Sequence, residues 1–351
     1  MTLPGSIFSE TYSQDQAYIR TRPQWLGLLA LIVGLIFFPL FGGAGLTGML
    51  IVIGIMVIAV VGLQITTGYS GQINMGQSAF MGVGAFICGA LALHFSFPFW
   101  IAIPLGGVAA ALFGSIFGIA AVRIKGFYMA LTTIAAQYIF SFVMLKLPKN
   151  WFGQSGGLKL EPASIGGFVF DTDMRMYYLI LIVAIIMVYG AWNLVRSKTG
   201  RALVAVRDND NAAEIIGIDV TRYKMIAFLI GGFYAGIAGG LWAYYIRYIQ
   251  VDQFTLFLSV WYVGMLIVGG MGSILGAIVG TFVIRILQEI VTHMGPQLAD
   301  FLPQVGGHIV FASMNMLLGA VIILFVIFEP KGLVHRWNII KESYRIWPFP
   351  H

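Results

Sequence analysis

Ten apolar stretches, candidates for crossing a lipid bilayer although the eighth is short enough to be re-entrant, are the feature that most constrains how this chain folds. A spanning helix needs about 20 mostly apolar residues, because hydrocarbon offers no partner for backbone N–H and C=O groups. The stretches cover residues 25–41, 46–65, 79–95, 97–122, 127–147, 176–194, 225–246, 255–268, 273–292 and 309–328. The sequence therefore predicts an all-α integral membrane protein, a bundle of about ten transmembrane helices with one broken, Gly-rich segment.

The composition excludes an ordinary soluble domain. Hydrophobic residues make up 59% of the chain and charged residues only 10%, against roughly 25% charged residues in soluble domains. The chain also has 44 glycines, and glycine is frequent in membrane helices because it lets two backbones approach closely. A compact polytopic bundle follows from both observations.

The distribution of basic residues predicts the orientation of the helices. With the N-terminus inside, fourteen lysines and arginines fall on the cytoplasmic side and five on the outer side, which agrees with the excess of positive charge on cytoplasmic loops. We expect residues 1–24 to form a cytoplasmic N-terminal tail, residues 25–330 the transmembrane domain and residues 331–351 a cytoplasmic C-terminal tail. The net charge of +6 is scattered along the chain, which argues against a nucleic-acid partner.

A polar segment that contains several glycines, here called the polar break, separates the second and third stretches. Irregular backbone at membrane depth is tolerated where it is buried in protein or lines a water-filled cavity. We therefore place the polar break along a translocation path; a plain cytoplasmic loop is the alternative that the topology also permits. The candidate path residues are Thr66, Thr67, Tyr69, Gln72, Asn74, Gln77 and Ser78. A second glycine cluster, residues 269–273, is better explained by a tight turn and close helix packing.

The longest hydrophilic run inside, residues 196–224, is here called the coupling loop. Its apolar residues follow helical steps on either side of a polar elbow at residues 208–211, which predicts two short helices. Gly217 would end the second helix. Such an element could be held by a separate motor protein through helix-in-groove contacts, and a solvated charged loop is the alternative.

The sequence offers no constellation for catalysis. The five histidines are dispersed, the single cysteine, Cys88, has no partner, and no phosphate-binding loop of the Gly-x-x-x-x-Gly-Lys-Ser/Thr type occurs. We expect no enzyme activity, metal or cofactor, so any ATP hydrolysis would belong to another polypeptide. An ion-coupled carrier remains an alternative, although the predicted spans hold a single acid, Glu289, one helical turn after Arg285.

Four passages of the chain resemble a known family. They cover residues 68–80, 123–133, 199–218 and 269–273. In this order they resemble the M-type permease subunits of branched-chain (hydrophobic) amino-acid ABC importers, whose wider family includes urea and amide importers. The resemblance covers roughly residues 46–330.

The resemblance implies a set of partners and roles. The partners would be a second, homologous permease subunit, two ATP-binding subunits, an extracytoplasmic solute-binding protein and membrane lipid, in a multi-pass assembly of the bacterial inner membrane. Branched-chain or other hydrophobic amino acids are the first expectation for the substrate, with urea or short amides as the alternative. The residues to which the resemblance assigns ATPase coupling are Arg201, Arg207, Ala212, Ala213, Glu214 and Gly217.

Overall fold

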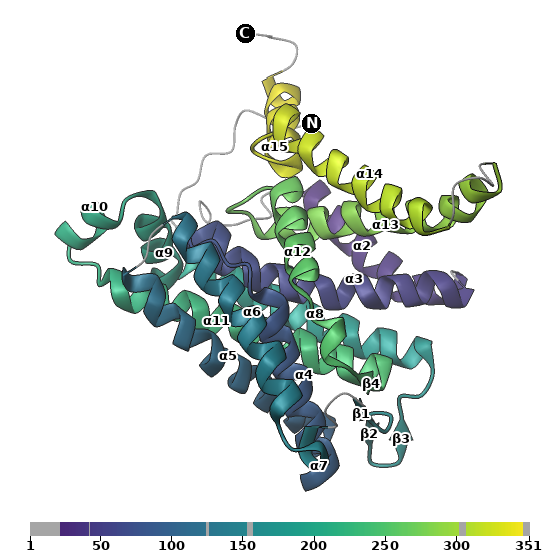
Figure 1. The fold of residues 1–351 in the computed structure, drawn as a ribbon. Coiled ribbons are helices and arrows are strands. Elements are labelled where there is room, and N and C mark those ends of the chain that lie inside the picture. Colours follow the sequence, from purple (N-terminus) through teal and green to yellow (C-terminus); the bar gives the residue numbers. More distant parts are fainter. Residues whose placement is uncertain (1–21, 42, 124–125, 153–156, 302–306, 347–351) are drawn as a thin grey trace.

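The computed structural model describes residues 22–41, 43–123, 126–152, 157–301 and 307–346 (Figure 1). Most of the expected N-terminal tail therefore lies outside the described residues. The helices are α2 Arg22–Phe41, α3 Gly43–Leu63, the π-helix η1 Gln64–Tyr69, α4 Gln77–Phe95, α5 Phe99–Arg123, α6 Phe127–Lys146, α7 Lys149–Phe152, α8 Asp173–Arg196, α9 Lys198–Asp208, α10 Asp210–Ile215, α11 Val220–Ile246, the 3₁₀-helix η3 Val251–Gln253, α12 Leu256–Gly269, α13 Ile274–Phe301, α14 Gly307–Phe328 and α15 Leu333–Ile346. The strands are β1 Leu158–Lys159, β2 Ser164–Ile165, β3 Phe168–Val169 and β4 Tyr248–Ile249.

The helical membrane fold is confirmed. Within the described part of the chain, eight helical segments are long and apolar enough to cross a membrane. Helices α2 and α14 coincide with the first and tenth expected stretches. The eighth stretch is longer than the sequence indicated, because η3 extends α12 into a candidate span over Val251–Gly269.

Helix α11 packs against α3, α4 and α5, with contacts so close that glycine is required. A Cβ atom on Gly239 would collide with the carbonyl oxygen of Met81 on α4, and one on Gly84 would collide with the backbone of Gly236. In lipid the hydrophobic effect does not drive helices together, so their association depends on van der Waals attraction, which close backbone contact increases. The abundant glycines therefore join these helices into one tightly packed block.

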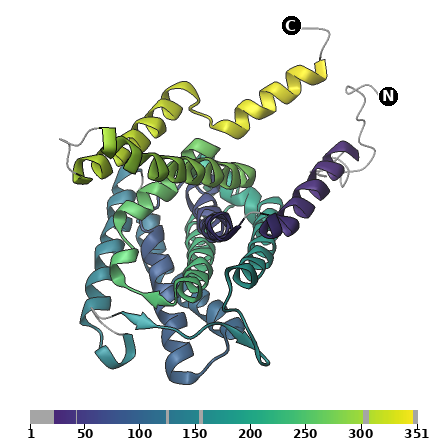
Figure 2. The same cartoon turned by 90° about the vertical axis from the view of Figure 1, so that its right-hand side faces the viewer.

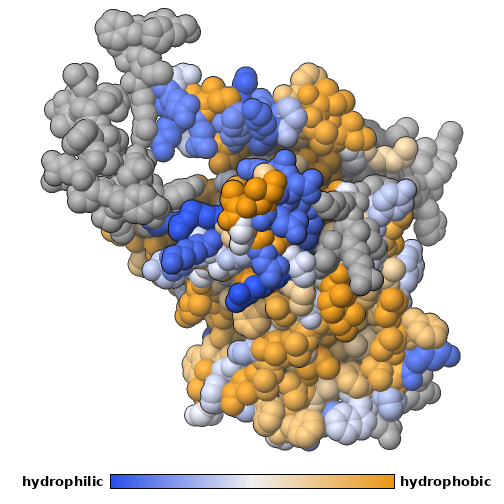
Figure 3. All heavy atoms as spheres, turned by 90° about the vertical axis from the view of Figure 1, so that its left-hand side faces the viewer, coloured by the Kyte–Doolittle hydropathy of each residue, from blue (hydrophilic) through white to orange (hydrophobic). Residues whose placement is uncertain are grey.

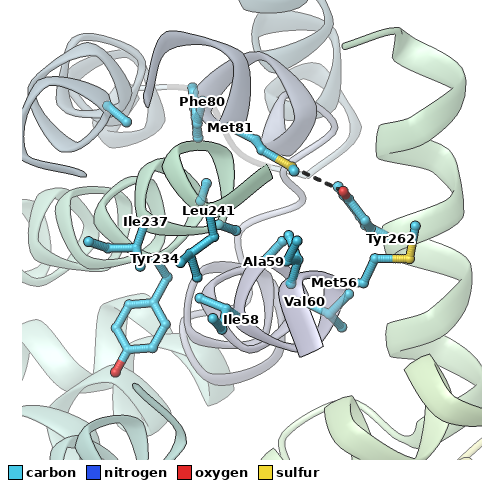
Figure 4. Close-up of a cluster of buried hydrophobic side chains, with 14 of the residues drawn as sticks. Met56, Ile58, Ala59, Val60, Phe80, Met81, Tyr234, Ile237, Leu241 and Tyr262 are labelled. Atoms are coloured by element: carbon cyan, nitrogen blue, oxygen red, sulfur yellow. Dashed lines mark hydrogen bonds between the residues drawn. The ribbon is translucent and has the colours of Figure 1, made fainter. Parts of the chain in front are cut away.

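Larger side chains fill the space around this block. Figure 4 shows Tyr234 and Leu241 of α11 near residues of α3, and the Tyr262 hydroxyl of α12 pointing at Met81 of α4. That hydroxyl donates to the Met81 sulfur at 3.1 Å, which satisfies a polar group that is 1% exposed. Helix α12 is thereby attached to the block.

Helix α2 is attached differently from the others. Most of the described large apolar side chains of α2 are exposed. In Figure 2, which shows α3 end-on, α2 leans away from the bundle. Pro39 lies inside α2 and has no N–H, so it leaves the Leu35 carbonyl without its helical donor. The Tyr177 hydroxyl of α8 donates to that carbonyl at 2.8 Å, and the Tyr178 hydroxyl donates to the Ile36 carbonyl at 2.9 Å.

The described connections between the helices gather at two opposite ends of the bundle (Figure 1). At one end, the polar break, the coupling loop and the turn at residues 269–273 meet through contacts described below. At the other end, β1 pairs with β4 in antiparallel register, and β2 pairs with β3 in a short hairpin. Figure 3 shows hydrophilic side chains gathered toward one part of the face that carries α9 and α10, with a largely hydrophobic surface over the rest.

The close contact between α4 and α11 lets us predict how one methyl group added at Gly239 changes the stability of the protein. Gly239→Ala should destabilise the detergent-solubilised protein by about 1–3 kcal/mol, because the added Cβ meets backbone that cannot move without separating two helices. The melting temperature from fluorescence-detected size-exclusion chromatography measures this loss. Gly34→Ala is the control, since nothing lies within 4 Å of a Cβ at that position; equal melting temperatures for the two variants would contradict the packing argument.

Candidate functional site

The polar break begins as a continuation of α3. The π-helix η1 carries the chain to Tyr69, so the expected helix end at Ile65 is wrong and the first three candidate path residues are helical. The chain then turns at Gly71, whose φ of +71° suits glycine because a Cβ is unfavourable in this region. Helix α4 starts at Gln77, so the irregular segment is shorter than predicted.

The centre of the polar break is buried and bonded within itself. Asn74 and Gln77 are both 0% exposed. The Asn74 amide donates from Nδ2 to Gln77 Oε1 at 3.0 Å, and Gln77 Nε2 donates to the Ala59 carbonyl of α3 at 2.7 Å. Thr67 Oγ1 donates to the Gln72 carbonyl at 3.0 Å. These side chains hold an irregular backbone inside the protein, so the segment is not a plain solvated loop.

The remaining candidate path residues differ in their contacts. Thr66 donates to the Leu63 carbonyl at 3.0 Å, and Tyr69 is 8% exposed. Gln72 Nε2 donates to the Ser70 hydroxyl at 2.7 Å. Gln72 Oε1 and the Ser78 hydroxyl are buried polar atoms without a hydrogen-bond partner among the described residues.

A glutamine that sequence reasoning missed ties the polar break to the second glycine cluster. Gln64 is 0% exposed, and its Nε2 donates to the carbonyls of Gly270 at 3.2 Å and Ser273 at 3.0 Å. A lone amide in an otherwise apolar stretch was the available signal, because a polar group at that depth must find a partner in the protein. The cluster itself forms the predicted tight turn, with φ of +118° at Gly270 and +82° at Gly272.

The coupling loop forms the two predicted short helices, α9 and α10, which meet at Asn209. The Asn209 side chain caps α10 by accepting from the N–H groups of Asn211 and Ala212, as a helix start requires. At the other end Gly217 has a φ of +87°, and the Ile218 N–H donates back to the Ala213 carbonyl at 3.0 Å. Gly217 thus closes α10, as predicted.

The two helices bury one side and expose the other. Leu203 and Val206 of α9 and Ala213 of α10 are at most 2% exposed. Ile215 and Ile216, by contrast, are 85% and 73% exposed. The other five candidate coupling residues are all exposed, namely Arg201, Arg207, Ala212, Glu214 and Gly217. An apolar tip flanked by polar groups is typical of a surface that binds another protein.

Arg207, at the end of α9, connects the coupling loop to the polar break. Its Nη1 donates to the Gly68 carbonyl at 3.0 Å, while Nε and Nη2 contact Asp208 Oδ1 at 3.0 and 2.9 Å. A Cβ on Gly71 would lie 2.8 Å from Arg207 Cγ, and one on Gly272 would lie 2.8 Å from Arg207 Nη1. The side chain, which is 36% exposed, therefore packs against both glycine turns on its protein-facing side.

A buried lysine, also missed from the sequence, fixes the other end of the loop. Lys224 in the first turns of α11 is 5% exposed, and its Nζ lies 2.7 Å from Asp210 Oδ2 at the start of α10. Removing either partner would leave an uncompensated buried charge, which is strongly destabilising. A cavity of about 260 Å³ separates this pair from the polar break and is lined by residues 70–73 and 206–211, among others.

Among the described residues, no group of three or more His, Cys, Asp or Glu side chains is arranged to hold a metal ion. Cys88 is buried in α4, and the His94 ring stacks on Trp151 at a centroid distance of 4.8 Å. The polar groups brought together by the structure instead join a loop to a helix bundle. In the described part of the chain these polar groups hold neighbouring elements together.

Comparison with known proteins gives the family. The sequence pattern of the branched-chain amino acid transport system permease component matches residues 45–327. The chain is 25% identical over 338 residues to the high-affinity branched-chain amino acid transport system permease protein LivM of Salmonella typhimurium, covering 90% of this chain and 76% of that protein.

Other relatives have different names. A probable branched-chain amino acid transport permease protein LivH of Methanocaldococcus jannaschii is 25% identical over 265 residues, covering 71% of this chain and 80% of that protein. The fructose import permease protein FrcC of Rhizobium meliloti is 25% identical over 302 residues, covering 77% and 79%. No solved structure matches the chain. Because the family pattern covers most of the chain, this multi-pass membrane protein belongs to the branched-chain amino acid permease family of ABC importers.

Proposed function

We propose that the chain is the M-type permease subunit of an ATP-driven, binding-protein-dependent importer of branched-chain or other hydrophobic amino acids. It forms the translocation path with a second, homologous permease, and two separate ATP-binding subunits drive it from the cytoplasm. Both termini face the cytoplasm in this proposal. The relatives named LivM support the substrate class, and the sugar permease among the relatives makes the substrate a matter for direct test.

The observation that carries the proposal is the physical link from α10 to the polar break. The exposed Ile215 and Ile216 form an apolar tip that an ATP-binding subunit would cover. Movement of that tip reaches α11 through the buried Lys224–Asp210 pair and the polar break through Arg207. A loop held at both ends in this way acts as a two-state element that an external motor biases.

In this proposal the polar break borders the path. Asn74 and Gln77 hold its backbone in place through their buried hydrogen bonds. The groups open to the path are those with partial or full exposure, which are Thr67, Gly71, Ile73 and Met75. A shift of Arg207 against Gly71 would change their position directly.

Purification from the native membrane tests the function as a whole. The tagged chain should bring with it a second permease and ATP-binding subunits, and the complex in proteoliposomes should accumulate leucine only with ATP and the solute-binding protein. Uptake of fructose, urea or a short amide in place of leucine would contradict the substrate class. Uptake by the chain alone, driven by an ion gradient, would contradict the importer mechanism itself.

From the exposed apolar tip we predict that a charge introduced there weakens binding of the ATP-binding subunits. Ile215→Asp should weaken capture of the ATP-binding subunits by at least about tenfold, because a buried apolar anchor typically contributes more than about 1.4 kcal/mol to binding. Pull-down of the ATP-binding subunits at graded concentrations measures this. Ile340→Asp on α15, which makes the same change at a side chain 53% exposed, is the control; equal loss in both variants would show a general effect of charge.

From the contact between Arg207 and Gly68 we predict that replacing Arg207 uncouples ATP hydrolysis from transport. Arg207→Gln should keep the ATP-binding subunits bound and hydrolysing ATP, while leucine transported per ATP falls about two- to thirtyfold, the range expected when one coupling contact is lost. Parallel uptake and phosphate-release assays in proteoliposomes give this ratio. Arg222→Gln, an exposed arginine in the first turn of α11, is the matched control, and an unchanged ratio in Arg207→Gln would remove the role assigned to this contact.

A further inference from the structure

Helix α15, the last described element of the chain, runs across the direction of α3, which is part of a candidate membrane span. In Figure 2 α15, in yellow, is seen along its length and points away from the bundle, whereas α3 is seen end-on. Helix α15 has 14 residues, with charged side chains among apolar ones, and a spanning helix needs about 20 mostly apolar residues. Its orientation and composition therefore suit a helix that lies along the membrane surface.

The start of α15 is fixed at the end of the bundle that holds the coupling loop. A Cβ on Gly332, where φ is +80°, would collide with Gly270 Cα, so the chain just before α15 rests on the second glycine cluster. Arg336 Nε lies 3.2 Å from Glu329 Oε1, which follows α14. Because Gln64 joins the same glycine cluster to the polar break, α15 leaves the bundle at the level where the coupling loop meets it.

One side of α15 carries an apolar stripe, formed by Leu333, Trp337 and Ile340. These residues follow one another at intervals of four and three, so they lie on one side of the helix. Leu333 packs against the hydrophobic core of the bundle, whereas Trp337 is 66% exposed and Ile340 is 53% exposed. The apolar side that begins on the protein core thus continues beyond the edge of the bundle, where the described residues leave it largely uncovered.

Cationic side chains lie on both sides of the apolar stripe. At about 100° per residue, Arg336 lies to one side of Trp337, and Lys341 lies to the other side of Ile340. Glu342, the only acid in α15, is roughly two and a half turns after Leu333 and therefore lies on the side opposite the stripe. The stripe is thus bordered by positive charge, while the negative charge points away from it.

This pattern fits the boundary between lipid headgroups and acyl chains. An interfacial helix buries its apolar side about 5–10 Å into that boundary and keeps Lys and Arg near the headgroups, and tryptophan favours the same depth. An ATP-binding subunit would approach from the face that carries α9 and α10. In Figure 3, which shows that face, mostly hydrophilic side chains appear at the upper left, where α15 lies. Such a subunit would therefore meet the polar side of α15, and the stripe is left for lipid.

We propose that α15 is an interaction surface for anionic phospholipids. Trp337 and Ile340 insert at the boundary between headgroups and acyl chains, and the basic side chains beside them contact the lipid phosphates. Lys331 and Lys341, both exposed, provide most of the preference for anionic lipid, because Arg336 already has Glu329 as a partner. The contact holds α15 on the membrane surface beside the second glycine cluster.

The test measures lipid contact in the complete complex that the tagged chain brings with it, placed in lipid vesicles. A fluorophore is attached at Ile340→Cys on the stripe or at Asn338→Cys away from it; Cys88 is buried, and the labelled parent gives the background. Phospholipids with brominated acyl chains quench a fluorophore that they touch. We expect quenching at residue 340 and none at residue 338. Half-quenching at residue 340 should need about fivefold less brominated phosphatidylglycerol than brominated phosphatidylcholine, which corresponds to the about 1 kcal/mol that one nearby cation contributes.

The double variant Lys331→Gln with Lys341→Gln should bring the two half-quenching concentrations together, because the cations that select phosphatidylglycerol are gone. Lys198→Gln with Arg222→Gln is the matched control, since it removes two exposed cations of the coupling loop and should keep the preference.

A fluorophore at residue 340 that neither lipid quenches would overturn the proposal and identify the stripe as a protein contact. Equal quenching by the two lipids in the parent, or an undiminished preference in the lysine double variant, would overturn the choice of anionic lipid. None of these outcomes depends on the transported solute, so the importer function is tested separately.

Discussion

Backbone groups that leave the helical ladder inside a membrane must find partners within the protein, and this constraint shapes the whole region around the polar break. Gln77 reaches the Ala59 carbonyl, and Gln64 reaches the carbonyls of Gly270 and Ser273. Arg207 reaches the Gly68 carbonyl from outside the bundle. Each of these hydrogen bonds joins two different elements of the fold. The bonds that satisfy the backbone carbonyls therefore also attach the coupling loop to the helix bundle.

Much of the fold could be predicted from the sequence because hydrophobic length and charge placement act locally. The apolar stretches match helices, and the alternation of apolar and polar residues around Asn209 was enough to predict α9 and α10. The burial of Lys224 and Gln64 could not be predicted in the same way, since each depends on a partner distant in sequence or across an elbow. The π-helix over Gln64–Tyr69 was not predicted, because hydropathy does not distinguish a π-helix from an α-helix.

The sequence predicted which segments form the candidate site, but the roles of individual residues differ from those expected. The coupling residues predicted from resemblance are exposed except for Ala213, which is buried. Arg207 differs from the other exposed ones through its contacts with Gly68, Gly71 and Gly272. The break residues were selected for their polarity, yet Asn74 and Gln77 use that polarity to bond one another. Polarity in an apolar sequence indicates that a partner exists, and the folded structure decides whether that partner is protein or solute.

The glycine contacts of α11 have a consequence for which helices can move relative to one another in the proposed transport cycle. Where the backbones of α4 and α11 touch at Met81 and Gly239, no side chain is present to change rotamer and let one helix glide along the other. We therefore expect α4, α5 and α11 to move as a single rigid unit in the proposed transport cycle. We expect the accompanying bending to occur at the positive-φ turns at Gly71 and Gly270–Gly272.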